Sequence, residues 1–397
     1  MTKGVAVTGM GIVSALGMGV DTNLKALLAG NSGICYPTIL ETAHSNLPVG
    51  EIKVTDKDLA MQLKLPQDHT LTRGALLGCL AAREALEKSG ITKPELSYVG
   101  FISATSVGGM DYTEKYFNSF EKEDTNRKFI QAQHPGFTTG RIKDFLALGG
   151  FTTTISTACS SSANAIMLGA RMIKSGQLKR VVVGGTDPLS RFTLNGFNSL
   201  MILSSKACKP FDEHRNGLNL GEGAAYLVLE ADDSVGDKNV LGRVTGYGNA
   251  NDAYHQTASS ETGNGAFLAM KKALYGAGVS PVEIEYINAH GTATHNNDLS
   301  ESRALLRIFG DSLPAMNSTK AYTGHTLAAA GAVEAVFSLL SLKHQTIFPG
   351  LNFRDSMPET GIKPITDLTY KNLKNILSNS FGFGGNCTSL IISNNEG

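Results

Sequence analysis

An internal repeat constrains the fold more than any other feature of the sequence. Several segments recur at a constant offset of 188 residues: Ala85-Leu86 with Ala273-Leu274, Gly90-Ile91 with Gly278-Val279, Glu95 with Glu283, and Tyr98-Val99 with Tyr286-Ile287. Each copy predicts a helix, a glycine stop, a short turn and an apolar strand. A chain built this way is expected to fold as two similar halves.

Two shorter echoes agree with this repeat. The opening VTGMG (7–11) returns as VTGYG (244–248), and GEGAAYLVL (221–229) resembles GGNCTSLII (384–392). We therefore predict two halves, residues 1–238 and 239–397, each alternating helix and strand around a mostly parallel sheet. No low-complexity linker separates them, so one packed body is expected. Extra material near residues 12–70 and 106–150 is expected to form a cap, a partner surface or a substrate pocket.

A candidate nucleophile lies in the stretch 151–173, FTTTISTACSSSANAIMLGARMI. A run of β-branched residues predicts a strand up to Thr157, and apolar residues at helical spacing follow from Ala163 onward. Cys159 should therefore lie where a strand gives way to a helix N-terminus. The helix dipole there favours an anion, which would lower the pKa of the thiol. The alternative is a buried structural cysteine.

The amino-acid composition argues against several classes of protein. The 397 residues are 42% apolar and 18% charged, which is ample for a large core. The five scattered cysteines form no close pairs, so neither a disulfide framework nor a zinc knuckle is predicted. The formal net charge of zero gives no case for nucleic-acid binding. The sequence has no signal-peptide pattern and no window of membrane-spanning length, so we expect a cytoplasmic protein outside the membrane.

Two histidines in the second half are candidate bases. His290 follows a predicted strand in NAHGTAT (288–294), and His325 ends NSTKAYTGH (317–325). A small-residue helix then carries Glu334, and a glycine-rich turn, SNSFGFGGNC (378–387), holds Phe383. The turn fits neither nucleotide-binding glycine pattern.

Each of these residues also has a structural interpretation. His290 or His325 would then be a satisfied core residue, and Glu334 an exposed helix charge. His290, His295 and Asp298 would alternatively offer imidazole and carboxylate ligands to zinc. A spacing of five residues splays two side chains on a helix, so we expect no metal.

Taken together, five motifs are similar to those of the β-ketoacyl-acyl-carrier-protein synthases, in the elongating Cys-His-His branch of the thiolase-fold superfamily. They are TACSSSA (157–163), KPFDEHRNGLNLGEGAA (209–225), NAHGTATHNNDLSE (288–301), STKAYTGHTLAAAGAVEA (318–335) and NSFGFGG (379–385). The resemblance covers nearly the whole chain. It implies an α/β thiolase-like fold, in which two duplicated halves stack in five layers, α-β-α-β-α. It also implies an acyltransferase that needs no cofactor, since substrates arrive on the phosphopantetheine arm of acyl carrier protein.

The resemblance assigns roles to residues. Cys159 would accept the acyl group, and His290 and His325 would be the catalytic pair. Lys320 and Glu334 would form a network that orients His325. Initiating synthases have Asn in place of His325. Thiolases use a second catalytic cysteine, whereas Cys387 lies beyond the glycine-rich turn.

The remaining site roles also rest on the resemblance. Phe383 would be the gate residue, and its backbone N–H would form the oxyanion hole with that of Cys159. Val107, in SATSVGGM (103–110), would set the depth of the acyl tunnel.

The implied reaction is a decarboxylative condensation. The Cys159 thiolate takes the acyl group, a malonyl thioester loses carbon dioxide, and the enolate attacks the acyl-enzyme to extend it by two carbons. Two neutral histidines would stabilise the enolate. The alternative is a ketosynthase subunit of a polyene or polyketide system that works with a chain-length-setting partner. We expect a homodimer, or in the alternative a heterodimer with a related subunit.

One departure from the family pattern lies after the gate. The glycine-rich turn usually continues with Thr-Asn, whereas here it continues with Asn386-Cys387. The carrier protein is acidic in this family, so basic residues are candidate docking residues. They are Lys64, Arg127, Lys128 and Lys206.

Overall fold

The computed structural model describes residues 4–119, 122 and 124–395, without the side chains of 124, 125 and 128. Two half-sheets dominate it. The first contains β1 (Val5–Ser14), β3 (Gly100–Ala104), β4 (Thr152–Ile155), β5 (Arg180–Asp187) and β6 (Gly223–Glu230). The second contains β7 (Gly242–Asn251), β8 (Tyr286–Asn288), β9 (Ala315–Asn317), β12 (Asn375–Phe381) and β13 (Asn386–Ser393). The short strands are β2 (Gly17–Met18), β10 (Thr346–Ile347) and β11 (Thr369–Tyr370).

The strand order repeats between the two half-sheets. The continuous order is β4-β3-β5-β6-β1-β7-β13-β12-β8-β9, in which β1 and β7 join the halves. Read outward from this junction, β1-β6-β5-β3-β4 corresponds to β7-β13-β12-β8-β9. The duplication inferred from the sequence is therefore present in the fold, although the boundary at residue 238 stays a prediction.

The prediction of mostly parallel sheets was wrong in detail. In the first half β3 pairs in parallel with β4 and β5, but β6 pairs antiparallel with β5 and β1. The second half repeats this pattern, because β8 is parallel to β9 and β12 whereas β13 is antiparallel to β12 and β7. Each half-sheet is therefore mixed.

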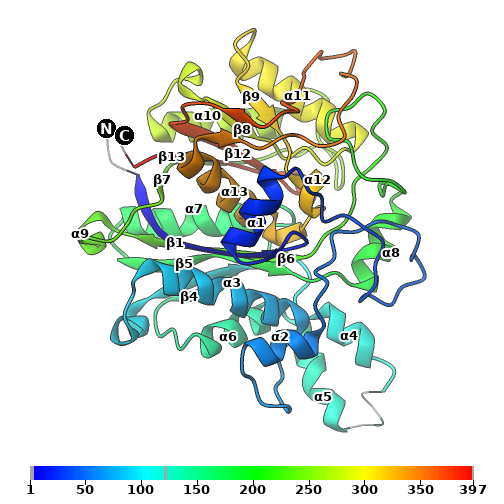
Figure 1. Ribbon diagram of the computed structural model, residues 1–397, viewed down its shortest axis with the longest axis vertical. Coiled ribbons are helices and arrows are strands. Elements are labelled where there is room, and N and C mark those ends of the chain that lie inside the picture. Colours follow the sequence, from blue (N-terminus) through cyan, green and yellow to red (C-terminus); the bar gives the residue numbers. More distant parts are fainter. Residues whose placement is uncertain (1–3, 120–121, 123, 396–397) are drawn as a thin grey trace.

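Helices lie outside and between the half-sheets, which gives the five layers seen in Figure 1. The pair α3 (Arg73–Ser89) and α6 (Pro135–Phe145) covers one outer face, and α10 (Asn264–Ala277) with α11 (His295–Phe309) covers the other. The central layer contains α7 (Ser161–Lys174) and α13 (Ala330–His344). The remaining helices are α1 (Val20–Leu28), α2 (Asp56–Gln62), α4 (Met110–Tyr116), α5 (Asp124–Ile130), α8 (Arg191–Ser199), α9 (Asp232–Val235), α12 (Lys320–Thr323), η1 (Lys93–Tyr98), η2 (Gln131–Gln133), η3 (Pro281–Glu283), η4 (Leu327–Ala329) and η5 (Phe383–Gly385). The predicted thiolase-like fold is confirmed.

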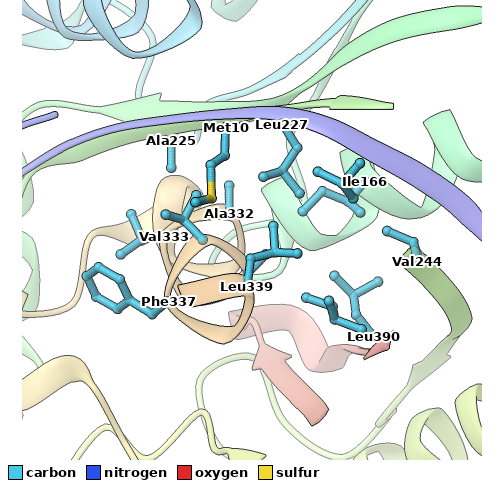
Figure 2. Packing of buried hydrophobic residues seen from close by; sticks show 14 of the residues in the cluster. Met10, Ile166, Ala225, Leu227, Val244, Ala332, Val333, Phe337, Leu339 and Leu390 are labelled. Atoms are coloured by element: carbon cyan, nitrogen blue, oxygen red, sulfur yellow. The ribbon is translucent and has the colours of Figure 1, made fainter. Parts of the chain in front are cut away.

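The core is built around α13. Its residues from Ala330 to Leu342 are all buried, because both half-sheets and α7 enclose the helix. Figure 2 shows Ala332 and Val333 of α13 beside Met10 of β1, and Phe337 of the same helix belongs to the same buried cluster. Burying a side chain such as that of Phe337 contributes about 1.5–3 kcal/mol. This packing fixes the helix that carries Glu334.

The two halves repeat each other in atomic detail. A Cβ atom at Gly9 would lie 2.1 Å from the Ala85 carbonyl oxygen, and one at Gly246 would lie 2.3 Å from that of Ala273. Both glycines therefore let a strand approach its outer helix, α3 or α10, at alanines that correspond in the repeat. Capping boxes recur as well, at Thr92 with Glu95 and at Ser280 with Glu283. These contacts explain why such residues repeat.

The two copies of the repeat differ in structure at one point. Tyr286-Ile287 lie in β8 and are buried, as expected. Tyr98, their predicted counterpart, instead ends η1 and is 82% exposed, and β3 begins only at Gly100. The expected strand at Tyr98-Val99 was therefore wrong, because the capped turn extends further in the first copy.

One helical stretch departs from the expectation that no segment reaches membrane-spanning length. Leu327–His344, which comprises η4 and α13, is long and apolar enough by composition to cross a membrane. It is nevertheless 89% buried inside the protein. Its hydrophobicity follows from its place between two half-sheets.

Candidate active site

Cys159 lies where the sequence predicts it, between a strand and a helix. β4 ends at Ile155, a bridge joins Thr157 to Cys159, and Ser160 is the N-cap of α7. Ala158 has a φ of 52°, a left-handed conformation that costs energy for a residue with a side chain. This sharp turn presents the thiol, which is 6% exposed.

The thiol is not activated in the way the sequence suggests. Burial raises the pKa of Cys159 to about 12. The positive charge of Lys320 and a hydrogen bond from the backbone N–H of Phe383 act in the opposite direction but are outweighed. The predicted lowering of this pKa was therefore wrong, because desolvation dominates. The thiol needs a base when it reacts.

His290 is held from several sides at the end of β8. Its backbone N–H donates to Glu301 Oε1 at 2.9 Å, and its ring nitrogen Nδ1 lies 3.2 Å from Lys320 Nζ. Lys320 also donates to the carbonyl oxygen of His290 at 2.6 Å and to Glu334 Oε1. All four residues are buried. The Lys320–Glu334 pair thus orients His290, whereas we predicted that this pair would orient His325.

These contacts set the protonation of His290. Burial lowers its pKa well below 6.5, and the positive charge of Lys320 and the neighbouring His325 ring lower it further. An ammonium group only donates hydrogen bonds, so Nδ1 accepts from Lys320 and Nε2 carries the proton. His290 is therefore a neutral ring that offers an Nε2–H donor.

His325 is the second neutral ring. Burial lowers its pKa well below 6.5, and Lys320 adds to the effect. Its backbone is fixed because His325 N–H donates to Asn219 O at 2.7 Å, whereas its side-chain Nδ1 has no hydrogen-bond partner among the residues that the structure describes. The His290 and His325 ring centroids lie 5.4 Å apart at an interplanar angle of 84°. One ring thus keeps an unengaged nitrogen.

A cavity of about 260 Å³ brings these groups together. Cys159, His290 and His325 line it from both halves of the chain, with Phe383 of the glycine-rich turn. The Phe383 ring stacks on Phe197 with centroids 5.6 Å apart. Because the Phe383 N–H reaches the Cys159 sulfur, it is placed to stabilise an oxyanion formed there.

The structure places Val107 apart from the residues that line this cavity. Val107 follows β3, is half-buried, and is not among the residues that line the cavity. Its backbone N–H instead contacts Asp187 Oδ1 at 3.4 Å. Its role in an acyl tunnel stays a prediction.

The proposed docking residues lie on different elements. Lys64 and Lys206 are exposed in loops that follow α2 and α8, and Arg127 is exposed on α5. The side chain of Lys128 lies outside the described residues. Docking at these four positions stays a prediction.

The groups considered for zinc differ in their burial. His290 and His295 both line the cavity, but His290 is buried whereas His295 is exposed at the start of α11. Asp298 accepts hydrogen bonds from the backbone N–H groups of Phe211 and Ala293. Across the residues that the structure describes, no group of three or more potential ligands could hold a metal ion.

Sequence reasoning missed several supporting residues. Glu301, the last residue of the motif NAHGTATHNNDLSE, fixes the backbone of both His290 and Gly291. Asn219, in the GLNLGEG motif, supports the loop of His325. Asn386 joins the glycine-rich turn to α7. Its unusual place in that turn was the one signal that pointed to it.

Comparisons with known proteins agree with this geometry. Residues 2–234 match the family model for the β-ketoacyl synthase N-terminal domain, and residues 241–354 match that for its C-terminal domain. The chain is 31% identical over 416 residues to 3-oxoacyl-[acyl-carrier-protein] synthase 2 of Staphylococcus aureus (strain COL), covering 99% of both chains.

Solved structures extend the similarity. The ishigamide ketosynthase/chain length factor superposes with a TM-score of 0.92 at 28% identity, covering 99% of this chain and 100% of that one. The ketosynthase ApeO of Xenorhabdus doucetiae, solved in complex with its chain length factor ApeC, gives 0.83 at 31% identity, covering 99% and 98%.

Proposed function

This chain belongs to the β-ketoacyl synthase family, and on that premise we propose that it condenses malonyl-acyl carrier protein with an acyl group held on Cys159. It is an acyltransferase-type condensing enzyme. The observation that carries the proposal is the single cavity that holds Cys159, His290 and His325 beside the Phe383 N–H. Fatty-acid elongation is the proposed pathway.

The first half-reaction forms a thioester on Cys159. The thiol gives up its proton to a neutral histidine nitrogen, and the thiolate attacks the acyl thioester carbonyl. The backbone N–H groups of Phe383 and Cys159 receive the oxyanion. The carrier thiolate then leaves and takes the proton. His325 lines the same cavity as Cys159, and its neutral ring is the proposed acceptor of that proton.

The second half-reaction breaks a carbon–carbon bond. The malonyl carboxylate leaves as carbon dioxide, and its electron pair passes into an enolate on the thioester. The Nε2–H of His290 and the ring of His325 donate to that oxygen. The enolate carbon attacks the acyl-Cys159 carbonyl, and Cys159 leaves as a thiolate that takes up a proton from solvent. The two neutral rings suit this role, because protonation of either would add a second charge beside Lys320.

The proposed partners are acyl carrier protein and a second subunit. Both structural relatives described above include a chain length factor, which supports a related subunit as a partner of this chain. We propose a homodimer for elongation and a heterodimer with a chain-length-setting subunit for the alternative, a polyene or polyketide system. Lys64, Arg127, Lys128 and Lys206 remain the proposed contacts for an acidic carrier.

The test is a condensation assay with purified protein. Acyl carrier protein loaded with an acyl group and a second loaded with malonyl are mixed with the chain, and products are identified by mass. We expect a 3-oxoacyl carrier two carbons longer and one carbon dioxide per product. Activity that requires a co-expressed related subunit would favour the heterodimer, whereas no product under either condition would contradict the proposal.

A further inference from the structure

Asn386, the residue that departs from the family pattern, is the centre of a polar cluster beneath the nucleophile. Its side-chain oxygen accepts hydrogen bonds from Ser160 Oγ at 2.7 Å, Asn164 Nδ2 at 2.8 Å and Asn249 Nδ2 at 2.9 Å. Thr388 Oγ1 lies 3.4 Å away. An amide oxygen has two lone pairs, so its acceptor capacity is fully used. The cluster crosses from the second half of the chain to the first.

The same residue closes the loop that carries Phe383. Within the gate loop, Gly382–Gly385, the Gly382 N–H donates to the carbonyl oxygen of Asn386 at 2.8 Å. Gly385 has a φ of 82°, and a Cβ there would lie 2.1 Å from Asp252 O, so the loop is tightly seated at this end. Asn386 therefore holds the base of the gate loop by its backbone and α7 by its side chain.

Side-chain alternation explains what the departure changes. Successive residues of a strand point to opposite faces. At the start of β13, Cys387 lines the cavity and Asn386 faces α7. An amide at position 387 would point into the cavity, whereas the amide at 386 points at Ser160, the neighbour of Cys159. Compared with the family pattern, the amide therefore lies not on the cavity wall at position 387 but at position 386, where it contacts Ser160 beside the nucleophile.

We propose that Asn386 is a positioning residue that couples the gate loop to the nucleophile turn. With its hydrogen bonds in place, the Phe383 N–H stays on the Cys159 sulfur and the loop covers the thiol. Without them, the loop and the turn move independently, which exposes the thiol and misplaces the oxyanion donor. One part of this inference rests on the proposed function, namely the role of the Phe383 N–H as an oxyanion donor in acyl transfer.

The test compares Asn386→Ala with Ser393→Ala. Ser393 lies on the same strand about 23 Å away, at roughly 3.3 Å per residue. It also makes partly buried hydrogen bonds, to Thr245 and Asn375. Alkylation by iodoacetamide is followed by peptide mass, with the exposed Cys35 as the internal standard. We expect Cys159 alkylation relative to Cys35 to rise about tenfold in Asn386→Ala, from the loss of one to two net hydrogen bonds. Ser393→Ala should stay near wild type.

The condensation rate should change in the opposite direction. Acyl transfer should fall in Asn386→Ala while alkylation rises selectively at Cys159, because general destabilisation would also raise the alkylation of the other buried cysteines, Cys79 and Cys208. Equal alkylation ratios in the two variants would overturn the proposal. Asn386→Thr is measured in parallel, because its shorter side chain cannot span both Ser160 and Asn164. If Asn386→Ala does not fold, the ratio of Cys159 to Cys35 alkylation in Asn386→Thr tests the proposal instead. Since iodoacetamide needs no acyl substrate, this outcome is independent of whether the protein condenses acyl groups.

Discussion

Lys320 lies between Glu334 and the ring of His290, donating to Glu334 Oε1 while its Nζ is 3.2 Å from His290 Nδ1. The lysine charge is thus matched by a carboxylate on α13 and directed at one ring nitrogen. Because burial, aided by that charge, lowers the pKa of His290 well below 6.5, the ring stays neutral and its tautomer is fixed. The acid–base state of His290 therefore depends on a residue 44 positions away in the chain, Glu334.

Replacing Glu334 by Gln tests this arrangement. The buried Lys320 charge would lose its counter-charge, so the ammonium would shift away from His290 Nδ1. We expect condensation to slow by up to about 100-fold, the effect of misplacing a catalytic group by about 1 Å. The fold should persist, with a lowered melting temperature. Glu87→Gln, at an exposed position, is the matched control, and an unchanged rate in Glu334→Gln would make Glu334 a bystander.

Replacing His290 or His325 by Ala should separate the two half-reactions. Acylation of Cys159 should partly survive in each, because the other ring and the Phe383 N–H remain. Malonyl decarboxylation should fall by about 10²–10⁴-fold, the usual contribution of a positioned acid or base. Release of labelled carbon dioxide measures the second step. Rates near wild type in both variants would contradict the enolate assignment.

The lowered histidine pKa values predict a distinct pH dependence. A free histidine is half-protonated near pH 6.5, but His290 and His325 remain neutral there because burial and Lys320 oppose a further charge. We expect the decarboxylation rate to be maintained between about pH 8 and pH 6. A rate that halves near pH 6.5 would show that one ring titrates normally.

Val107→Phe tests the proposed acyl tunnel. The larger ring would fill volume that a long acyl tail occupies, so the longest accepted chain should shorten while short chains stay active. Overpacking a closed wall costs about 1–3 kcal/mol. Acylation rates over a chain-length series are compared with melting curves. A uniform loss for all chain lengths would identify Val107 as ordinary core.

Local patterns in the sequence predicted much of the fold and of the candidate site. Ala85 and Ala273, which are related by the offset of 188 residues, make equivalent contacts, since Gly9 approaches the first and Gly246 the second. The change from β-branched to helical spacing placed Cys159 correctly at a strand–helix turn. These features depend on residues near in sequence or on a repeated unit.

The rest depends on distant contacts that have no local pattern. The pKa of Cys159 follows from how deeply the assembled halves bury it, which outweighs the helix terminus. Whether Lys320 faces His290 or His325 is decided by the turn of α12 against β8. Phe197 comes from an element of the first half without a counterpart motif, so its stacking on Phe383 left no signal.

Acylation of Cys159 is the most direct test of the account. Wild-type protein and Cys159→Ala are exposed to acyl carriers of graded length, and the intact mass and the modified peptide are measured. We predict that wild type gains the mass of one acyl group on the peptide containing Cys159. The variant should gain none and should not condense, yet retain some malonyl decarboxylation through His290 and His325. An adduct on another residue, or condensation by the variant, would contradict the central role of Cys159.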